Sequence, residues 1–297
     1  MITMQHETQC AGWFKLEAIR PDGTRRVLAD WFPNLILDGG LDRMGENSNY
    51  LSWCQVGSGS TAPVATQTAL INRIAGTNTL QAQVYGAQAT APYYGWYRRT
   101  YRFAKGVAAG NLSEVGVGWD TSGSLFSRAL ILDGGGSPTT ITVLSDEVLD
   151  VTYELRRYPG TVDLTGTVVL GGVTHNWVSR AAAVTNSQFW AGTGAMVLEY
   201  AAAFNGDIGP VTASTPSGTS GTLSITALAY SSGSYTRAAT VSAGLNDYNL
   251  SGGIRSIWTY AYYSGIGSYQ IQFDPAIPKD NTKVLSLTIQ HSWARRP

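Results

Sequence analysis

Two pairs of acidic residues could supply general acid–base chemistry. Glu114 with Asp120, and Asp146 with Glu147, have the residue types that a glycosidase places on the two sides of a cleft. Asp146-Glu147 comes just before a predicted strand, where a solvated turn is the simpler interpretation, and Glu114 is expected to point outward from its own strand. Nothing in the spacing marks either pair as catalytic. The chain is therefore not expected to be an enzyme, and a surface-glycan hydrolase (depolymerase) stays an alternative.

The three histidines of the chain carry little indication of metal or acid–base chemistry. His6, His175 and His291 lie in three different regions, without the close His-x-x-x-His or histidine–carboxylate spacing of metal sites. His291 falls on the apolar face of the last predicted strand, which favours a core or interface histidine whose hydrogen bonds are satisfied. We expect no metal site and no catalytic residue.

A glycine-rich segment superficially matches a phosphate-binding turn. The segment Gly57-Ser58-Gly59-Ser60-Thr61-Ala62 follows a predicted strand, but Pro63 comes next and no alternation of strands and helices surrounds it. No acidic residue stands on a following strand to bind a ribose. The segment is predicted to be a glycine turn, and no cofactor is expected.

Two aromatic stretches are the candidate contact surfaces. Tyrosine and tryptophan rings stack on sugar faces and anchor protein interfaces, so a row of them on an exposed strand could contact a glycan or another subunit. The alternative is core packing and cross-strand pairing, which is common for aromatic residues in strands. We favour core and subunit interface over glycan binding. The candidates are Tyr93, Tyr94, Trp96, Tyr97, Trp258, Tyr260, Tyr262 and Tyr263.

Composition is typical of a turn-rich β protein. Only 13% of the 297 residues are charged, whereas the chain has 34 Gly, 16 Tyr and 9 Trp. Lys plus Arg equals Asp plus Glu at 20 each, so no overall field favours nucleic acid. Cys10 and Cys54 are too few for a disulfide framework and are predicted to be free thiols. No signal peptide and no long apolar run is recognised, so we expect a soluble product without membrane insertion.

The elements that must position these residues are predicted to be strands. From Leu149 to Arg156 apolar and polar residues alternate, as in a half-buried strand, and residues 284–293 close the chain in the same way. Residues 13–30 are expected to form a hairpin, 34–44 and 64–74 short helices, and 195–200 a strand.

The chain divides most naturally at the turn Pro159-Gly160. Residues 102–159 loosely parallel residues 237–297, which leaves open either two related modules or similarity through strand composition alone. We predict an all-β fold of two β-sandwich (jelly-roll-like) domains, with a few short helical turns. The expected domains are 1–160 and 161–297.

Several segments resemble structural proteins of tailed bacteriophages, described mostly as tail-fibre or tail-associated virion proteins. The likeness covers the first 160 residues and about the last 20. The segments that carry it are residues 14–45, CQVGSGSTAPVATQTAL, residues 108–159 and IPKDNTKVLSLTIQHSW. The resemblance implies a non-enzymatic component of a tail, fibre or baseplate that mediates subunit assembly and host-surface adhesion. A capsid decoration or collar protein is the alternative within the virion.

The same resemblance implies partners and a location. The expected assembly is a homo-oligomer, with a trimer as the expected state, bound to other phage virion proteins and to a bacterial surface glycan or protein receptor. Residues 1–160 would be the virion-attachment module, and residues 161–297 the oligomer- or receptor-facing module. The protein would be made in the host bacterial cytoplasm and become part of the virion.

Overall fold

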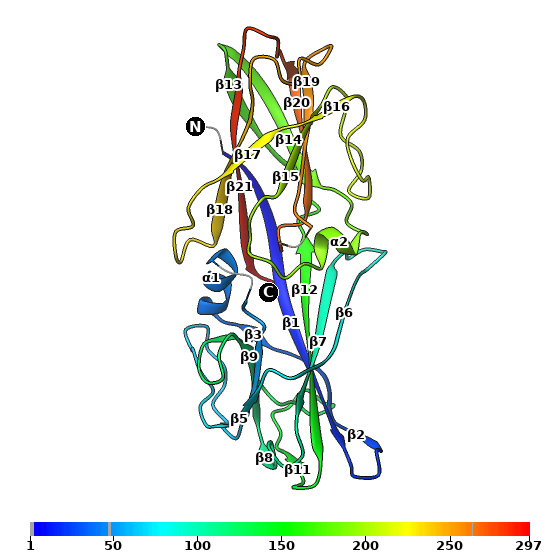
Figure 1. Cartoon of the computed structure of the whole chain (residues 1–297), viewed down its shortest axis with the longest axis vertical. Coiled ribbons are helices and arrows are strands. Elements are labelled where there is room, and N and C mark those ends of the chain that lie inside the picture. Colours follow the sequence, from blue (N-terminus) through cyan, green and yellow to red (C-terminus); the bar gives the residue numbers. More distant parts are fainter. Residues whose placement is uncertain (1–2, 47–48, 263) are drawn as a thin grey trace. The chain divides into compact units, whose positions relative to one another are not determined.

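The computed structural model describes residues 3–46, 49–262 and 264–297, and most of their regular structure is β-strand (Figure 1). The predicted all-β fold with sandwich-like sheets and a few helical turns is confirmed. The described residues contain two short helices, α1 (Asp38–Glu46) and α2 (Ser187–Trp190). The helix expected near residues 34–44 is therefore confirmed and begins slightly later than predicted.

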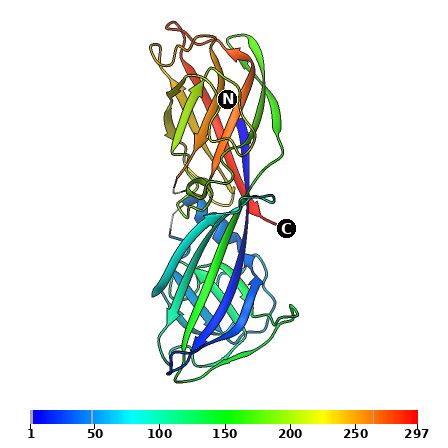
Figure 2. The ribbon, with the colours of Figure 1, turned by 90° about the vertical axis from the view of Figure 1, so that its right-hand side faces the viewer.

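The largest sheet has the strand order β17-β18-β21-β1-β12-β7-β6, with β2 paired to β1. Figure 2 shows β6 in cyan as the outermost strand beside β7, followed by the green β12 and the blue β1. The bounds are β1 (Thr3–Ile19), β2 (Arg25–Pro33), β6 (Leu80–Ala87), β7 (Gly95–Phe103), β12 (Val148–Pro159), β17 (Ser224–Ala227), β18 (Thr236–Ala243) and β21 (Leu285–Arg295).

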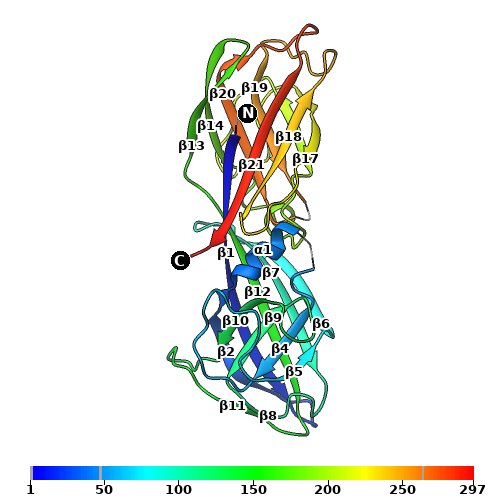
Figure 3. The ribbon, with the colours of Figure 1, turned by 90° about the vertical axis from the view of Figure 1, so that its left-hand side faces the viewer.

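A five-stranded sheet follows the order β3-β10-β9-β4-β5 (Figure 3). Its strands are β3 (Leu35–Ile36), β4 (Trp53–Gly57), β5 (Arg73–Thr77), β9 (Glu114–Gly118) and β10 (Leu125–Leu130). A two-stranded sheet pairs β8 (Gly110–Leu112) with β11 (Ile141–Val143). All the pairings within these two sheets are antiparallel.

A six-stranded antiparallel sheet has the order β13-β14-β20-β19-β15-β16. Its strands are β13 (Leu164–Leu170), β14 (Val173–Ala181), β15 (Tyr200–Phe204), β16 (Ser220–Thr222), β19 (Ile254–Tyr260) and β20 (Ser268–Ile277). The prediction of a strand at residues 195–200 is wrong, because β15 begins only at Tyr200.

The chain forms two compact units built from segments that are distant in sequence. The first unit comprises Met1–Gln9, Gly86–Trp96 and Arg157–Ala294, and contains the six-stranded sheet. The second unit comprises Cys10–Tyr85, Tyr97–Arg156 and Arg295–Pro297, and contains the five- and two-stranded sheets. Strands of the largest sheet supply residues to both units. The division into domains 1–160 and 161–297 was predicted from the sequence as two consecutive modules, and it stays a prediction.

Apolar alternation builds the core of the second unit. The predicted hairpin is present as β1 and β2, and Gly23 supplies the positive φ of 84° that its turn requires. Phe14 on β1 is fully buried, and its ring centroid lies 4.9 Å from that of Tyr153 on β12. The side chains of Leu149, Val151, Tyr153 and Leu155 are all buried, as the alternation of that strand predicts.

The core of the first unit combines apolar strands with large aromatic rings. Ile257, Ile271 and Phe273 are fully buried, and Trp190 of α2 packs its ring 5.5 Å from that of Tyr269. The Trp190 indole donates a hydrogen bond to the carbonyl of Ala182 at 3.2 Å, which satisfies its polar group. Buried residues of β19, β20 and α2 thus contribute to this core.

Candidate functional site

The first candidate carboxylate, Glu114, is buried and not outward-facing as predicted. Its side chain has no exposed surface and forms an ion pair with the equally buried Arg128 on β10, with donor–acceptor distances of 2.8 and 2.9 Å. The amides of Ile71 and Asn72 also donate to it, at 3.0 and 2.7 Å. Because the backbone of this segment turns around the carboxylate, the helix expected at 64–74 does not form, and residues 73–77 are β5 instead.

The glycine turn binds an anion, and that anion is the side chain of Glu114. The Gly59 amide donates to the Glu114 carboxylate at 3.0 Å. A Cβ on Gly59 would lie 2.5 Å from Glu114 Oε1, and a Cβ on Gly57 would lie 2.7 Å from the same oxygen. Glycine is needed at both positions because any side chain would displace the carboxylate. The prediction of a glycine turn is consistent with this geometry.

The environment of Glu114 favours its charged form. Burial alone would raise the pKa of Glu114, but hydrogen bonds from Asn72 and Ile71 and the charge of Arg128 outweigh burial, so the pKa is lowered. A general acid in a glycosidase needs the opposite shift. Glu114 therefore acts in the structure as the centre that ties the glycine turn to β9 and β10.

The second candidate pair is divided between solvent and interior. Asp146 is exposed, as predicted for a solvated turn, whereas Glu147 is 1% exposed. The Glu147 carboxylate accepts hydrogen bonds from Arg26 at 2.9 and 3.0 Å and from the Leu144 amide at 2.9 Å. Burial would raise its pKa, but the Leu144 amide and the arginines Arg26 and Arg20 lower it. The interpretation of Glu147 as solvated was wrong because it closes the turn before β12.

The polar face of β12 carries a ladder of charged groups. Asp150 and Glu154 are each 1% exposed, although both stand on the side of the strand opposite the apolar core. Arg102 binds Asp150 with two hydrogen bonds of 2.7 Å, and Arg98 and Arg156 both contact Glu154. These partners cover the carboxylates by charge pairing and by the packing of arginine side chains.

Two tryptophans extend this charged face. The Arg156 guanidinium lies 3.9 Å from the ring centroid of Trp13, and that of Arg98 lies 5.1 Å from the ring centroid of Trp31. Such cation–π contacts stabilise arginine over indole by about 0.5–1 kcal/mol at exposed sites. The buried carboxylates on this face of β12 are thus paired with arginines, two of which also contact tryptophan rings.

The structure brings together two histidines that the sequence left in different regions. His6 on β1 and His291 on β21 have ring centroids 6.4 Å apart, because these strands are neighbours in the largest sheet. His6 stacks on Tyr269 at 4.1 Å. His291 is 3% exposed, which matches the expected core position, but neither of its ring nitrogens has a hydrogen-bond partner among the described residues. The expectation that its hydrogen bonds are satisfied was wrong.

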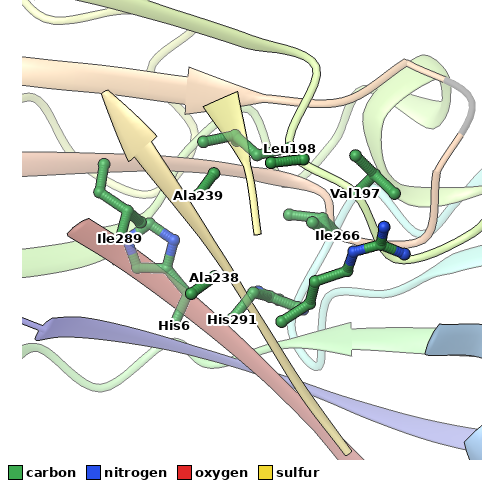
Figure 4. A pocket seen from close by; sticks show the side chains of 10 residues that line it. His6, Val197, Leu198, Ala238, Ala239, Ile266, Ile289 and His291 are labelled. Atoms are coloured by element: carbon green, nitrogen blue, oxygen red, sulfur yellow. The ribbon is translucent and has the colours of Figure 1, made fainter. Parts of the chain in front are cut away.

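A small pocket of about 10 Å³ lies beside these histidines (Figure 4). This volume corresponds to about one water molecule and is too small for an organic ligand. Apolar side chains make up most of its wall. The lining residues are His6, Val197, Leu198, Ala227, Arg237, Ala238, Ala239, Ile266, Ile289 and His291.

Burial keeps both histidines neutral. It lowers the pKa of His6 to about 3, and it lowers the pKa of His291 well below the usual range, with further lowering from His6 and Arg157. The third histidine, His175, is also buried and lies 2.6 Å through Nδ1 from the Pro275 carbonyl oxygen. Among the described residues, no group of three or more His, Cys, Asp or Glu side chains is arranged to hold a metal ion.

The first aromatic stretch is divided between core and partly exposed positions. Tyr97 is buried, with 6% of its surface exposed. Tyr94 is half-buried, and its ring centroid lies 5.2 Å from that of Tyr158. Trp96 covers Gly86 of the adjacent strand, where a Cβ would lie 2.5 Å from the indole. The candidates of this stretch, all buried or half-buried, are Tyr93, Tyr94, Trp96 and Tyr97.

The second aromatic stretch forms a cluster with two residues that the sequence did not single out. Trp258 and Tyr260 on β19 have ring centroids 4.4 Å apart, and Tyr262 lies 4.6 Å from Tyr260. Phe189 of α2 stacks on Tyr262 at 5.1 Å, and Tyr200 of β15 stacks on Tyr260 at 4.6 Å. We call these five residues the aromatic cluster.

The aromatic cluster has a buried base and a partly exposed rim. Phe189 and Tyr260 are 5% and 9% exposed, whereas Tyr262 is 40% exposed. Burial, and then hydrogen bonding with Tyr262, raises the pKa of Tyr260, so its hydroxyl stays protonated. The cluster can therefore present apolar ring faces and neutral hydroxyls. Tyr263, the eighth candidate, lies outside the described residues.

Polar groups border this rim. The Glu199 carboxylate accepts a hydrogen bond from the Tyr262 amide at 2.8 Å, and the Trp258 indole donates to the Ser268 hydroxyl at 2.8 Å. Rings bordered by carboxylate and hydroxyl groups suit either a polar protein interface or the face of a sugar.

The remaining sequence expectations concern thiols and membranes. Cys10 and Cys54 are both buried free thiols, as predicted, and burial raises the pKa of Cys54. Neither described helix is long and apolar enough to span a bilayer.

In comparisons with protein families, curated proteins and solved structures, nothing matches this chain.

Proposed function

We propose that this protein is a structural component of a tailed-phage virion, in the tail, fibre or baseplate, where it joins other subunits and contributes to host-surface adhesion. The observation that supports a structural role is that four acidic side chains are buried and paired with arginines. Glu114, Glu147, Asp150 and Glu154 are almost completely buried and bound to arginines. The virion setting is supported by the resemblance of the sequence segments, and the all-β scaffold suits a rigid particle component.

Self-association is part of this proposal. An oligomer would cover exposed strand edges and apolar side chains, and a trimer is the state suggested by the resemblance. The aromatic cluster is the surface that we assign to contact with a neighbouring subunit or a bacterial receptor, since aromatic anchors dominate the energetics of such contacts. The protein would act by assembly and binding.

Antibody labelling of phage particles in negative stain tests the proposed address. The particles must come from the phage whose genome encodes this chain, and particles lacking the protein serve as the control. Label on the tail, fibre or baseplate is the expected result. Label on the head or neck would instead support a capsid decoration or collar protein, and unlabelled particles would contradict a virion role.

A glycan assay separates the structural role from the hydrolase alternative. Purified protein is expected to release no reducing sugar from host surface polysaccharide. If it does release sugar, Glu114→Gln and Asp146→Ala variants would show whether either candidate carboxylate is responsible. Adhesion without hydrolysis would appear as binding to host cells that Tyr262→Ala weakens while the polysaccharide stays intact.

A further inference from the structure

Strand β6 presents an open edge. It is the last strand of its sheet, and no other strand in the described part of the chain pairs with its outer side. Residues 80–85 are all exposed, and because successive side chains point to opposite faces, both faces of the strand are accessible. The strand contains no proline, so every residue retains its backbone N–H. Such an edge is a template for pairing with another strand.

The usual protection of an edge strand is missing here. Natural edges are commonly blunted by charged side chains or proline, but the chain has no Asp, Glu, Lys or Arg from Ile74 to Tyr97. Leu80, Val84 and Tyr85 are 44, 49 and 58% exposed. An exposed, uncharged, partly apolar strand indicates a surface that another strand covers.

The sequence of β6 is complementary to itself. Residues 80–84 read Leu-Gln-Ala-Gln-Val, which is symmetric in residue type about Ala82. In an antiparallel pair centred on Ala82, Leu80 would face Val84 of the second strand, and Gln81 would face Gln83. Apolar residues would thus meet apolar residues, and amides would meet amides that can hydrogen-bond to each other. Self-complementarity is the property that a two-fold interface requires.

Strand β13, another uncharged edge strand, is less accessible than β6 because one of its side chains is buried. It ends the six-stranded sheet, but its Val168 is only 3% exposed and already packs within its own unit. Asp163, next to the start of β13, forms an ion pair with Arg180. Strand β13 therefore serves as a matched control for β6.

We propose that β6 pairs antiparallel with β6 of a second copy of this chain, about a two-fold axis at Ala82. This inference rests on the self-association that forms part of the proposed function, and it specifies the contact. A two-fold axis gives assemblies with an even number of chains, unlike the trimer suggested by the resemblance.

Introducing a charge at Ala82, on the proposed axis, tests the pairing. Ala82 faces its own copy in the proposed register, so Ala82→Glu would place two carboxylates directly opposite each other, and Ala82→Lys two ammonium groups. Like charges so placed repel each other, and each variant is expected to weaken self-association at least about 100-fold. An equimolar mixture of the two variants should restore association, because opposite charges then meet. Sedimentation equilibrium measures the masses, from 31.7 kDa for one chain.

The control variant is Val169→Glu on β13, where the side chain is 62% exposed, and it should keep the wild-type mass. A monomeric wild-type chain, or Ala82 variants that keep the wild-type mass, would overturn the inference. Restored association in the mixture also shows that both variants fold. If particles contain the protein but the Ala82 variants associate normally, only this inference fails; if the chain pairs as proposed but particles lack it, only the virion proposal fails.

Discussion

Glu114 in the second unit and His291 in the first are both buried polar side chains, but their surroundings differ. Glu114 has a buried arginine and three backbone amides as partners, whereas His291 has ring nitrogens without hydrogen-bond partners in the described residues. The second unit thus keeps buried charges by neutralising them, and the first unit keeps its histidines by leaving them uncharged. The two units should therefore respond differently to loss of a partner and to acid.

Loss of the Glu114 partner should have the largest effect. Arg128→Met leaves a buried carboxylate without its counter-charge, and breaking such a pair costs about 3–5 kcal/mol. We expect faster hydrogen exchange in peptides covering β9, β10 and the glycine turn, measured by mass spectrometry. The control is Lys283→Met, which removes an exposed ion pair with Asp280 and should change stability much less, because water screens such a pair. Equal effects of the two variants would contradict the central role of Glu114.

Acidification should affect the first unit before the second. The pKa of His6 in the folded state, about 3, lies below its value of about 6.5 in the unfolded chain. The unfolded chain therefore binds more protons, so stability is full above about pH 6.5 and falls as the pH drops toward 3. The expected loss is about 1.4 kcal/mol per pH unit for each such histidine. The lowered pKa values of Glu114 and Glu147 add losses only below about pH 4.5.

Urea unfolding of wild type and His6→Phe at pH 7 and pH 5 measures this difference. Phenylalanine keeps a ring to stack on Tyr269 but cannot take up a proton, so the variant should lose less stability between the two pH values. The same loss in both proteins would contradict the assignment of the pH response to His6.

A smaller effect is expected where the glycine turn meets its carboxylate. In Gly59→Ala the new Cβ would lie 2.5 Å from Glu114 Oε1, and such overpacking costs about 1–3 kcal/mol. Gly39→Ala in α1 is the matched control, because nothing lies within 4 Å of a Cβ there and alanine favours a helix by up to about 1 kcal/mol. Thermal unfolding of both variants measures the difference. A neutral Gly59→Ala would show that the turn tolerates a shift of Glu114.

The sequence predicts the strands better than it predicts these polar sites. Alternation from Leu149 to Arg156 indicates which face of β12 is apolar, because the period of two is a local property. The environment of Glu114 depends on Arg128 and on loop amides far along the chain, which no local period reveals. An arginine within the apolar run Leu-Phe-Ser-Arg-Ala-Leu-Ile-Leu was the available signal, since a buried arginine requires an anionic partner.

Long-range pairing accounts for the other differences. His6 and His291 meet because β1 and β21, from opposite ends of the chain, are neighbours in one sheet. The aromatic cluster likewise needs Phe189 and Tyr200, which join Trp258 only through the packing of α2 and the pairing of β15 with β19. Residue types alone identified part of the cluster, and the topology supplied the rest.

Quantitative mass spectrometry of purified phage particles tests the central claim, a structural role in the virion, most directly. The particles are washed at high salt and compared with known tail and capsid proteins of the same phage. The account predicts that this chain remains with the particle at a fixed, multiple copy number per tail. Absence of the chain from washed particles, while it persists free in the lysate, would contradict the account.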